Sequence, residues 1–312
     1  MSDIAEEKNS DFALYVKTAA ILLVIAAMSV YYYGLRALIV IVFTTAVCCG
    51  ADAVCVLFQS KKLHIYDISP FVTGLTLSMM LPASVPYTVA AAAGIFAICI
   101  AKHPLSGTGR SIFNPATVGW IFVSLFFTED VLKYPRTFTD LDLTNIVTQT
   151  LYSPVSPSSG VTDYELMVGA FAGPMGTTAV VLLAVTAVIM AFAGVISKLS
   201  FTFACLPVIV YSMVAGGFNG VKYAVCGDMF LFGLVFLICT DSVRIGTNTG
   251  RILHGFIGGL FTVAASALSA AEYPIVYAAV ISAPFVPLCD DWGSRISKRL
   301  FRKKGDSVVG KE

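Results

Sequence analysis

Apolar positions fill long, nearly continuous stretches of the chain, and polar residues collect in the short intervals between them. Stretches such as "AAILLVIAAMSVYYYG" and "TAVVLLAVTAVIMAFAGVI" have no polar face, which excludes a water-facing amphipathic helix there. A membrane-spanning helix needs about 20 apolar residues. We therefore predict ten spans, at about residues 13–34, 36–59, 69–83, 84–101, 113–128, 175–197, 201–216, 223–240, 252–271 and 273–290. The third, fifth and seventh are short, which predicts tilted or interrupted helices.

Composition supports the same interpretation. The chain of 312 residues is 57% hydrophobic and only 12% charged, whereas a soluble domain carries about 25% charged residues. The predicted fold class is therefore all-α, a polytopic membrane protein with about ten transmembrane helices. Its expected surroundings are the lipid bilayer, and no nucleic-acid partner is expected. A soluble helical protein with a large core, the alternative, would need the polar helix faces that these stretches lack.

The eight cysteines lie in or beside apolar segments. They form no CxxC pair and have no nearby pattern of histidine ligands. We therefore expect core thiols, and we predict no metal or iron–sulfur site held by this chain alone.

Charge predicts the orientation of the spans, because short cytoplasmic loops collect Lys and Arg. The basic tail, residues 292–312, places the C-terminus in the cytoplasm, and an even number of spans places the N-terminal segment, 1–12, there too. The mostly acidic loop 129–165 then falls outside. The same count puts further basic residues on the cytoplasmic side, namely Lys61, Lys62, Lys102, His103, Lys198, Arg244 and Arg251.

The outer loop divides the single predicted membrane domain, 13–291, into two halves of five spans, 13–128 and 166–291. A short internal echo accompanies this division: "SGTGR" (106–110) resembles "TNTGR" (247–251), each at the cytoplasmic end of a span. Internal repeats are common in membrane transport folds, so we expect two pseudo-repeated halves.

Polar residues at membrane depth are costly, and their positions are therefore informative. Asp67, Asn114 and Asp241 each lie at the end of a span, where helix capping competes with a chemical role. Asp52, within "CCGADAV", is the most deeply placed acid. It is interpreted either as an element of a proton or cation relay or as a buried hydrogen-bond partner.

The stretch "GPMGTTA", residues 173–179, combines a flexible approach with two hydroxyls at the start of the sixth span. Thr177 and Thr178 fall in or next to the first helical turn, where a hydroxyl can cap the helix. The free N–H groups and partial positive charge of a helix N-terminus also favour a phosphate. The residues alone favour the cap over a phosphate ester.

Four motifs in order carry a family resemblance: "DISPFVTGLTLSMMLPASVP", "FNPATVG", "GPMGTTA" and "GDMFLFGLVFLICTDSV". Together they resemble the D-type subunit of the Rnf electron-transport complex, which is related to the B-type subunit of the sodium-translocating NADH:quinone oxidoreductase, Nqr. The resemblance runs from about residue 12 to residue 291, and the chain length favours the Rnf type.

The resemblance implies FMN joined through its phosphate to a threonine hydroxyl by a separate flavin transferase, outside the cytoplasmic membrane. Attachment motifs of the family read Gly-Glu-Thr-Ser or Ser-Gly-Ala-Thr. Gly176 matches the motif glycine and Thr178 the modified threonine in both versions. Thr177 stands where Glu or Ala is expected, which makes it the alternative acceptor.

The resemblance also implies a second, non-covalent flavin (riboflavin) in some members, for which Asp67, Asn114 and Asp241 are the weak candidates. Other Rnf subunits are the implied partners, and they would hold the NAD and iron–sulfur sites.

The resulting hypothesis is a multi-pass subunit of the inner membrane, in a ferredoxin:NAD oxidoreductase complex coupled to Na⁺ or H⁺ movement. This chain would contribute one flavin as an electron relay and would not be catalytic alone. Two alternatives stay open, a channel or transporter for a small polar solute and a scaffold subunit without flavin.

Overall fold

The computed structural model describes residues 2–58, 67–104, 112–138, 150–151, 162–243, 245–268 and 272–309. Its helices are α1 (Ser2–Tyr33), α2 (Leu35–Phe58), α3 (Ser69–Met80), α4 (Tyr87–Phe96), α5 (Pro115–Phe126), α6 (Thr128–Val131), α7 (Asp163–Val168), α8 (Val180–Phe192), α9 (Lys198–Lys222), α10 (Phe230–Gly233), α11 (Cys239–Ser242), α12 (Asn248–Ala267), α13 (Pro274–Ser282) and α14 (Phe285–Val309). Three π-helical segments are η1 (Ala97–Lys102), η2 (Tyr223–Gly227) and η3 (Leu234–Ile238). Two strands of two residues, β1 (Lys133–Tyr134) and β2 (Thr150–Leu151), pair antiparallel. The predicted all-α class is confirmed.

Each of the ten predicted spans contains a helix, and the polytopic membrane character is confirmed. By length and composition, Phe12–Tyr33, Leu35–Phe58 and Lys198–Gly227 can each cross a membrane. Pro274–Ser282 and Phe285–Lys298, bent by 61°, make a fourth span if they count as one. Several other segments hold shorter apolar helices, as expected for the third and fifth.

Two predicted boundaries differ from the structure. The seventh span, expected to be short, lies in the 25-residue helix α9, because its apolar run continues as helix into the polar residues on both sides. A kink at Gly217 (φ 62°, ψ −154°) interrupts it, and glycine tolerates that backbone conformation. At the C-terminus, α14 continues through residue 292, since the basic tail contains good helix formers.

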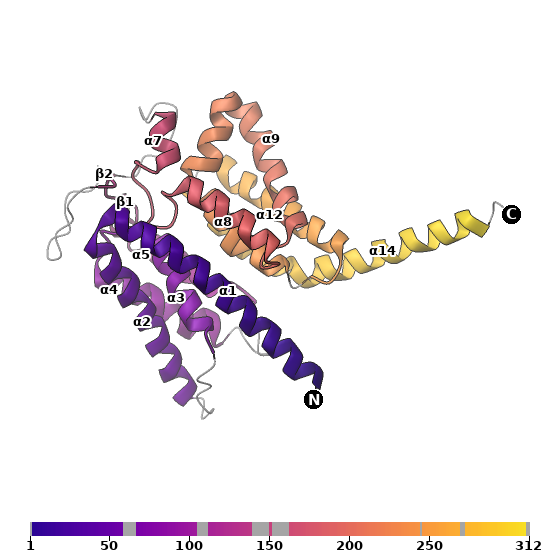
Figure 1. Ribbon diagram of the computed structural model, residues 1–312, viewed down its shortest axis with the longest axis horizontal. Coiled ribbons are helices and arrows are strands. Elements are labelled where there is room, and N and C mark those ends of the chain that lie inside the picture. Colours follow the sequence, from indigo (N-terminus) through magenta and orange to yellow (C-terminus); the bar gives the residue numbers. More distant parts are fainter. Residues whose placement is uncertain are drawn as a thin grey trace.

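The helices form two groups (Figure 1). The first half, α1 to α5, lies on one side and the second half on the other, while α14 projects away from both. The halves meet where α1 contacts α8 and where α5 contacts α13. Within the second half, α12 packs closely on α9, because Gly255 and Gly259 lie directly against the backbone of Ser200 and Ala204. The echo at 106–110 lies outside the described residues.

A buried arginine organises the turn that follows α3. Arg36, at the start of α2, donates from Nε to the carbonyl of Ala83 at 3.0 Å and from Nη2 to those of Ser84 and Val85 at 3.3 and 3.4 Å. Its guanidinium also lies 5.4 Å from the ring centroid of Tyr87. The end of α3 and the start of α4 are thereby held beside the start of α2, and this end of the molecule carries the first candidate site.

Candidate functional site

The approach to α8 is anchored on the ends of α1 and α3. Tyr33 Oη donates to the carbonyl of Gly173 at 3.0 Å, and Ser29 Oγ donates to that of Met175 at 2.7 Å. The amides of Met175 and Gly176 donate to the carbonyls of Leu81 and Met79 at 3.1 and 2.8 Å. The ends of α1 and α3 and the start of α8 therefore meet at one end of the molecule, as the alternating span directions require. Which compartment this end faces stays a prediction.

Gly176 is required by close packing. A Cβ at this position would lie 2.6 Å from Met79 Cβ and 3.1 Å from Phe232 Cε2. Real Cβ atoms do not approach carbon so closely, so only glycine lets the backbone lie against the end of α3. The predicted glycine thus has a structural reason that is independent of any cofactor.

The two threonines differ in what their hydroxyls do. Thr177 Oγ1 donates to the carbonyl of Pro174 at 3.0 Å and closes the turn. Thr178 is fully buried, and its Oγ1 has no hydrogen-bond partner among the residues that the structure describes. The phenol of Tyr33 lies beside Thr178 but gives its proton to Gly173.

The cap interpretation of these threonines is wrong. Helix α8 begins at Val180, and its N-cap is Ala179, which has no side-chain cap hydrogen bond. Since Thr177 Oγ1 bonds to the Pro174 carbonyl inside the preceding turn, it satisfies no amide of α8. An unpaired buried hydroxyl costs about 1–3 kcal/mol, so the condition of Thr178 calls for an explanation.

A short helix covers Thr178. Gly169 ends α7 with φ +85° and lies against the backbone carbonyl of Thr178, where a side chain would not fit. Helix α7 is fixed by a capping box between Thr162 and Glu165 and by an ion pair of 2.6 Å between Lys222 and Asp163. The hydroxyl of Tyr32 donates to the Val168 carbonyl. The segment 162–169 is called the α7 cover below.

Aromatic residues fill the core beside this end. Trp120 Nε1 donates to the carbonyl of Met80 at 3.0 Å, and its ring meets that of Tyr273 edge to face at 5.7 Å. Tyr273 in turn meets Tyr134 at 6.2 Å. Next to Tyr273, in the segment between α12 and α13, burial raises the pKa of Glu272 to about 7. Three aromatic rings in contact therefore extend from the Met80 carbonyl, at the end of α3, to Tyr134.

The weak candidates separate into two regions. Asn114 caps α5 by accepting from the amide of Ala116 at 3.1 Å, and its Nδ2 donates to the Phe236 carbonyl at 3.4 Å. This bond brings Asn114 to η3, the segment that runs directly into α11 and Asp241. Asp67, in contrast, pairs with Lys102 at 3.2 Å. Asn114 therefore contacts η3 of the second half, whereas Asp67 contacts Lys102 of the first half.

The sequence matches the NQR2, RnfD, RnfE family over residues 5–297. The chain belongs to this family. The D-type subunit of an ion-translocating oxidoreductase complex from Methanosarcina acetivorans is 30% identical over 86% of each chain. The D-type subunit of a proton-translocating ferredoxin:NAD(+) oxidoreductase complex from Clostridium ljungdahlii is 25% identical over 85% of each. That of a Na(+)-translocating ferredoxin:NAD(+) oxidoreductase complex from Acetobacterium woodii is 24% identical, over 82% of this chain and 80% of the relative.

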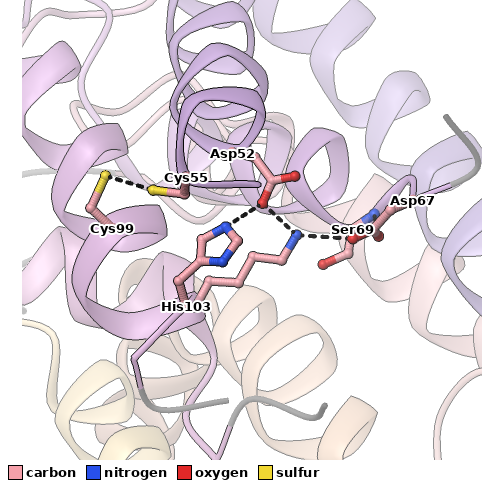
Figure 2. Close-up of polar contacts among 7 residues, drawn as sticks. Asp52, Cys55, Asp67, Ser69, Cys99 and His103 are labelled. Atoms are coloured by element: carbon pink, nitrogen blue, oxygen red, sulfur yellow. Dashed lines mark hydrogen bonds and ion pairs between the residues drawn. The ribbon is translucent and has the colours of Figure 1, made fainter. Parts of the chain in front are cut away.

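A second polar cluster in this family member lies near the end of α2, the end of η1 and the start of α3 (Figure 2). Asp52 Oδ1 accepts from Lys102 Nζ at 3.0 Å and lies 2.9 Å from His103 Nε2. Lys102 also pairs with Asp67, whose Oδ1 accepts from the amide of Ser69 at 2.9 Å. We call Asp52, Asp67, Lys102 and His103 the ionic cluster. Asp52 is therefore a hydrogen-bond partner in the structure, the second of its two interpretations.

Sequence reasoning missed two features of polar chemistry. Lys102 and His103 were expected only as cytoplasmic loop charges, whereas η1 turns them back onto Asp52. His254 was not singled out, although a histidine inside "RILHGFIGGLF" is an intramembrane ionisable residue. It is buried in α12, and its Nδ1 lies 2.7 Å from the hydroxyl of Ser242.

Proposed function

We propose that this chain is the D-type membrane subunit of an Rnf-type ferredoxin:NAD oxidoreductase complex. In this proposal it carries FMN, bound through a phosphoester to Thr178, as an electron relay coupled to Na⁺ or H⁺ translocation. Membership of the NQR2, RnfD, RnfE family and the names of relatives that match most of the chain support the assignment to such a complex. A proton-translocating and a sodium-translocating relative match almost equally well, so either coupling ion fits.

One observation carries the choice of attachment residue. Thr177 uses its hydroxyl to close a turn, whereas the Thr178 hydroxyl is buried without a partner in the described part of the chain. Forming an ester at Thr178 costs at most its contact with the Tyr33 phenol, while forming one at Thr177 would cost the bond to Pro174. The orphaned oxygen therefore fits a covalently bound phosphate, and it supports Thr178 over Thr177.

The residues around Thr178 would position and shield the group. Bound FMN supplies the redox chemistry, and the protein sets its position, polarity and water access. The anchored backbone at Gly173, Met175 and Gly176 holds Thr178 in one place, and the α7 cover excludes water from its backbone. A rigid attachment point suits a relay, because electron transfer depends on a fixed distance between cofactors.

The proposal includes a flavin transferase and the other Rnf subunits as partners, and the inner membrane as the location of a multi-pass chain. It extends to a second, non-covalent flavin, for which the region of Asn114 and Asp241 is favoured over Asp67. Asp67 is held in the ionic cluster by Lys102, whereas Asn114 links the two halves through η3.

The test is covalent flavin on the denatured chain. The chain is expressed with a flavin transferase, purified from membranes, denatured, and examined for in-gel fluorescence and for the intact mass of an FMN phosphoester. We expect flavin on the wild type and on Thr177→Ala, and none on Thr178→Ala. Thr178→Ser, which keeps a hydroxyl, should retain flavin in reduced yield.

Other outcomes would move or remove the assignment. Flavin on Thr178→Ala and none on Thr177→Ala would transfer the site to Thr177. A wild-type chain that assembles with its partners but carries no flavin would be a scaffold subunit, the second alternative from the sequence. Solute flux through the purified, flavin-free chain in liposomes would favour the transporter.

A further inference from the structure

Two cysteines from separate elements lie in contact beside the ionic cluster. Cys55 in α2 and Cys99 in η1 are 44 residues apart in sequence, and their Sγ atoms are 3.4 Å apart (Figure 2). Both thiols are free, and both side chains are half-buried. Neither takes part in the function proposed above, and the sequence predicted them only as core thiols.

Close packing of α2 on α4 and η1 produces this contact. Gly94, in the last turns of α4, lies against Cys48 of α2, where an added Cβ would meet Cys48 Sγ at 3.1 Å. The π-helical turn η1 then continues α4 and brings Cys99 to Cys55 and Lys102 to Asp52. π-helical turns are rare and recur at functional sites. The thiol pair and the Asp52–Lys102 ion pair are thus two neighbouring contacts between α2 and η1.

We propose that Cys55 and Cys99 form a thiol–disulfide site that reacts with a low-molecular-weight disulfide such as oxidised glutathione. One thiolate attacks a sulfur of the small disulfide and releases one reduced thiol. The second cysteine then attacks the mixed disulfide and releases the other. The protein loses two electrons and two protons and gains one S–S bond, and the small disulfide is reduced to two thiols.

The geometry favours this reaction over oxidation of isolated cysteines. A disulfide has an S–S length of about 2.05 Å, so the two sulfurs must approach by only about 1.4 Å from their separation of 3.4 Å. The bond would join α2 to η1 next to Asp52 and Lys102, and would fix the two helix ends that carry their ion pair. The charge pattern predicts that this end faces the cytoplasm, where reducing conditions keep such a pair as thiols until an oxidant appears.

The site does not rest on the proposed function, and its test needs no flavin. The full chain, purified in detergent, is incubated with oxidised glutathione, denatured, alkylated with N-ethylmaleimide and weighed. The reduced chain takes up eight maleimides, one for each cysteine. We expect two fewer after oxidation, with no retained glutathione, and restoration of eight by dithiothreitol.

Peptide mapping of the wild type locates the bond without relying on variants. Cys99 is the only cysteine in the tryptic peptide 63–102, whereas the peptide 37–61 contains Cys48, Cys49 and Cys55. We expect a cross-linked pair of these peptides whose fragments place the bond at Cys55. A bond to Cys48 or Cys49, or no cross-link, would overturn the proposal.

Variants test the need for both cysteines. Cys99→Ser and Cys55→Ser should each lose the cross-link, and a variant whose remaining cysteine is the attacking one should stop at the mixed disulfide and keep one glutathione. The matched control removes Cys205 and Cys239, two cysteines of the second half that lie near each other, of which Cys239 is fully buried. Its six remaining cysteines should still bind two fewer maleimides after oxidation than before. Eight maleimides on the oxidised wild type, or loss of the effect in the control variant, would contradict the site.

Discussion

The two ends of the first half treat polar groups in opposite ways. At one end the ionic cluster pairs two carboxylates with Lys102 and His103, and two thiols lie in contact beside it. At the other end, the hydroxyls of Ser29, Tyr33 and Thr177 each donate to a backbone carbonyl. The Thr178 hydroxyl, in the second-half stretch that packs on that end, has no partner in the described structure.

This difference suggests that the ionic cluster is a structural contact, whereas Thr178 is an attachment point. A membrane protein must satisfy its buried polar groups internally, because each unpaired group costs free energy. Where every group is paired, the simplest role is to hold elements together. Where a dense set of bonds leaves one hydroxyl unpaired, the surrounding bonds position that hydroxyl. Each prediction below disturbs one of the two ends and leaves the other as its reference.

The largest effect is expected from Gly176→Val. Its Cβ would lie 2.6 Å from Met79 Cβ and 3.0 Å from the carbonyl that accepts the Gly176 amide. Overpacking of this kind costs about 1–3 kcal/mol, and two further methyl groups place Val at the upper end. We expect a lower free energy of unfolding in mixed micelles and the loss of flavin attachment at Thr178.

Gly50→Ala is the matched control at the other end. Gly50 lies in α2 close to Asp52 in sequence, and a Cβ there would meet nothing within 4 Å. Alanine should leave stability unchanged or raise it by up to about 1 kcal/mol through helix propensity. Equal destabilisation by both substitutions would show that the close approach of Gly176 to α3 is not what matters.

Lys102→Gln tests the ionic cluster. It removes the ammonium from both Asp52 and Asp67, although Asp52 keeps His103. The Lys102 and Asp52 side chains are only 14% and 13% exposed, and hydrogen bonds to charged groups contribute about 1.5–3 kcal/mol. We expect a loss of about 2 kcal/mol in unfolding free energy, with covalent flavin at Thr178 unchanged.

The comparison for Lys102 is Lys133→Gln. Lys133 pairs with Glu129 at 3.5 Å, and the two side chains are 35% and 90% exposed. Exposed pairs contribute about 0–1 kcal/mol, so this variant should be close to the wild type. A Lys102→Gln variant as stable as Lys133→Gln would show that the ionic cluster does not hold α2 to η1.

A smaller effect is expected from Tyr33→Phe. The variant removes the hydroxyl that bonds to the Gly173 carbonyl and lies beside Thr178. Leaving one buried carbonyl without its partner costs about 1 kcal/mol. We expect Thr178 to remain the acceptor with a lower flavin yield, measured as fluorescence per mass of chain. An unchanged yield would show that the remaining bonds of the stretch suffice.

The sequence predicted elements well and pairings poorly. Long apolar runs predict helices from local pattern alone, and four ordered motifs predicted the family and pointed to Thr178 and Gly176. The pairing of Lys102 with Asp52 joins residues 50 positions apart, and it depends on how η1 continues α4. Likewise, only the fold of the turn shows that Pro174 takes the hydroxyl of Thr177. Neither the contact between distant positions nor the geometry of an irregular turn leaves a periodic signal in one sequence.

The smallest effect concerns pH and the α7 cover, which lies outside the spans. Hydrogen bonds from the Thr162 amide, and then from its hydroxyl, lower the pKa of Glu165 from its ordinary value of 4.5. A lowered carboxyl pKa stabilises the folded cover fully above the ordinary value. That contribution is lost as the pH falls below 4.5 through the lowered pKa, because the protonated acid accepts these bonds less well.

We therefore expect faster amide exchange in residues 162–169 at about pH 3 than at about pH 6, after correction for intrinsic rates. The Gly169 amide, which bonds to the Glu165 carbonyl, should report the change most directly. Glu165→Gln is the control, since glutamine completes a capping box without titrating. Because Gly169 lies on the Thr178 backbone, the same loosening should make flavin attachment faster at low pH in the wild type only. Equal exchange at both pH values would show that the capping box does not hold the cover over Thr178.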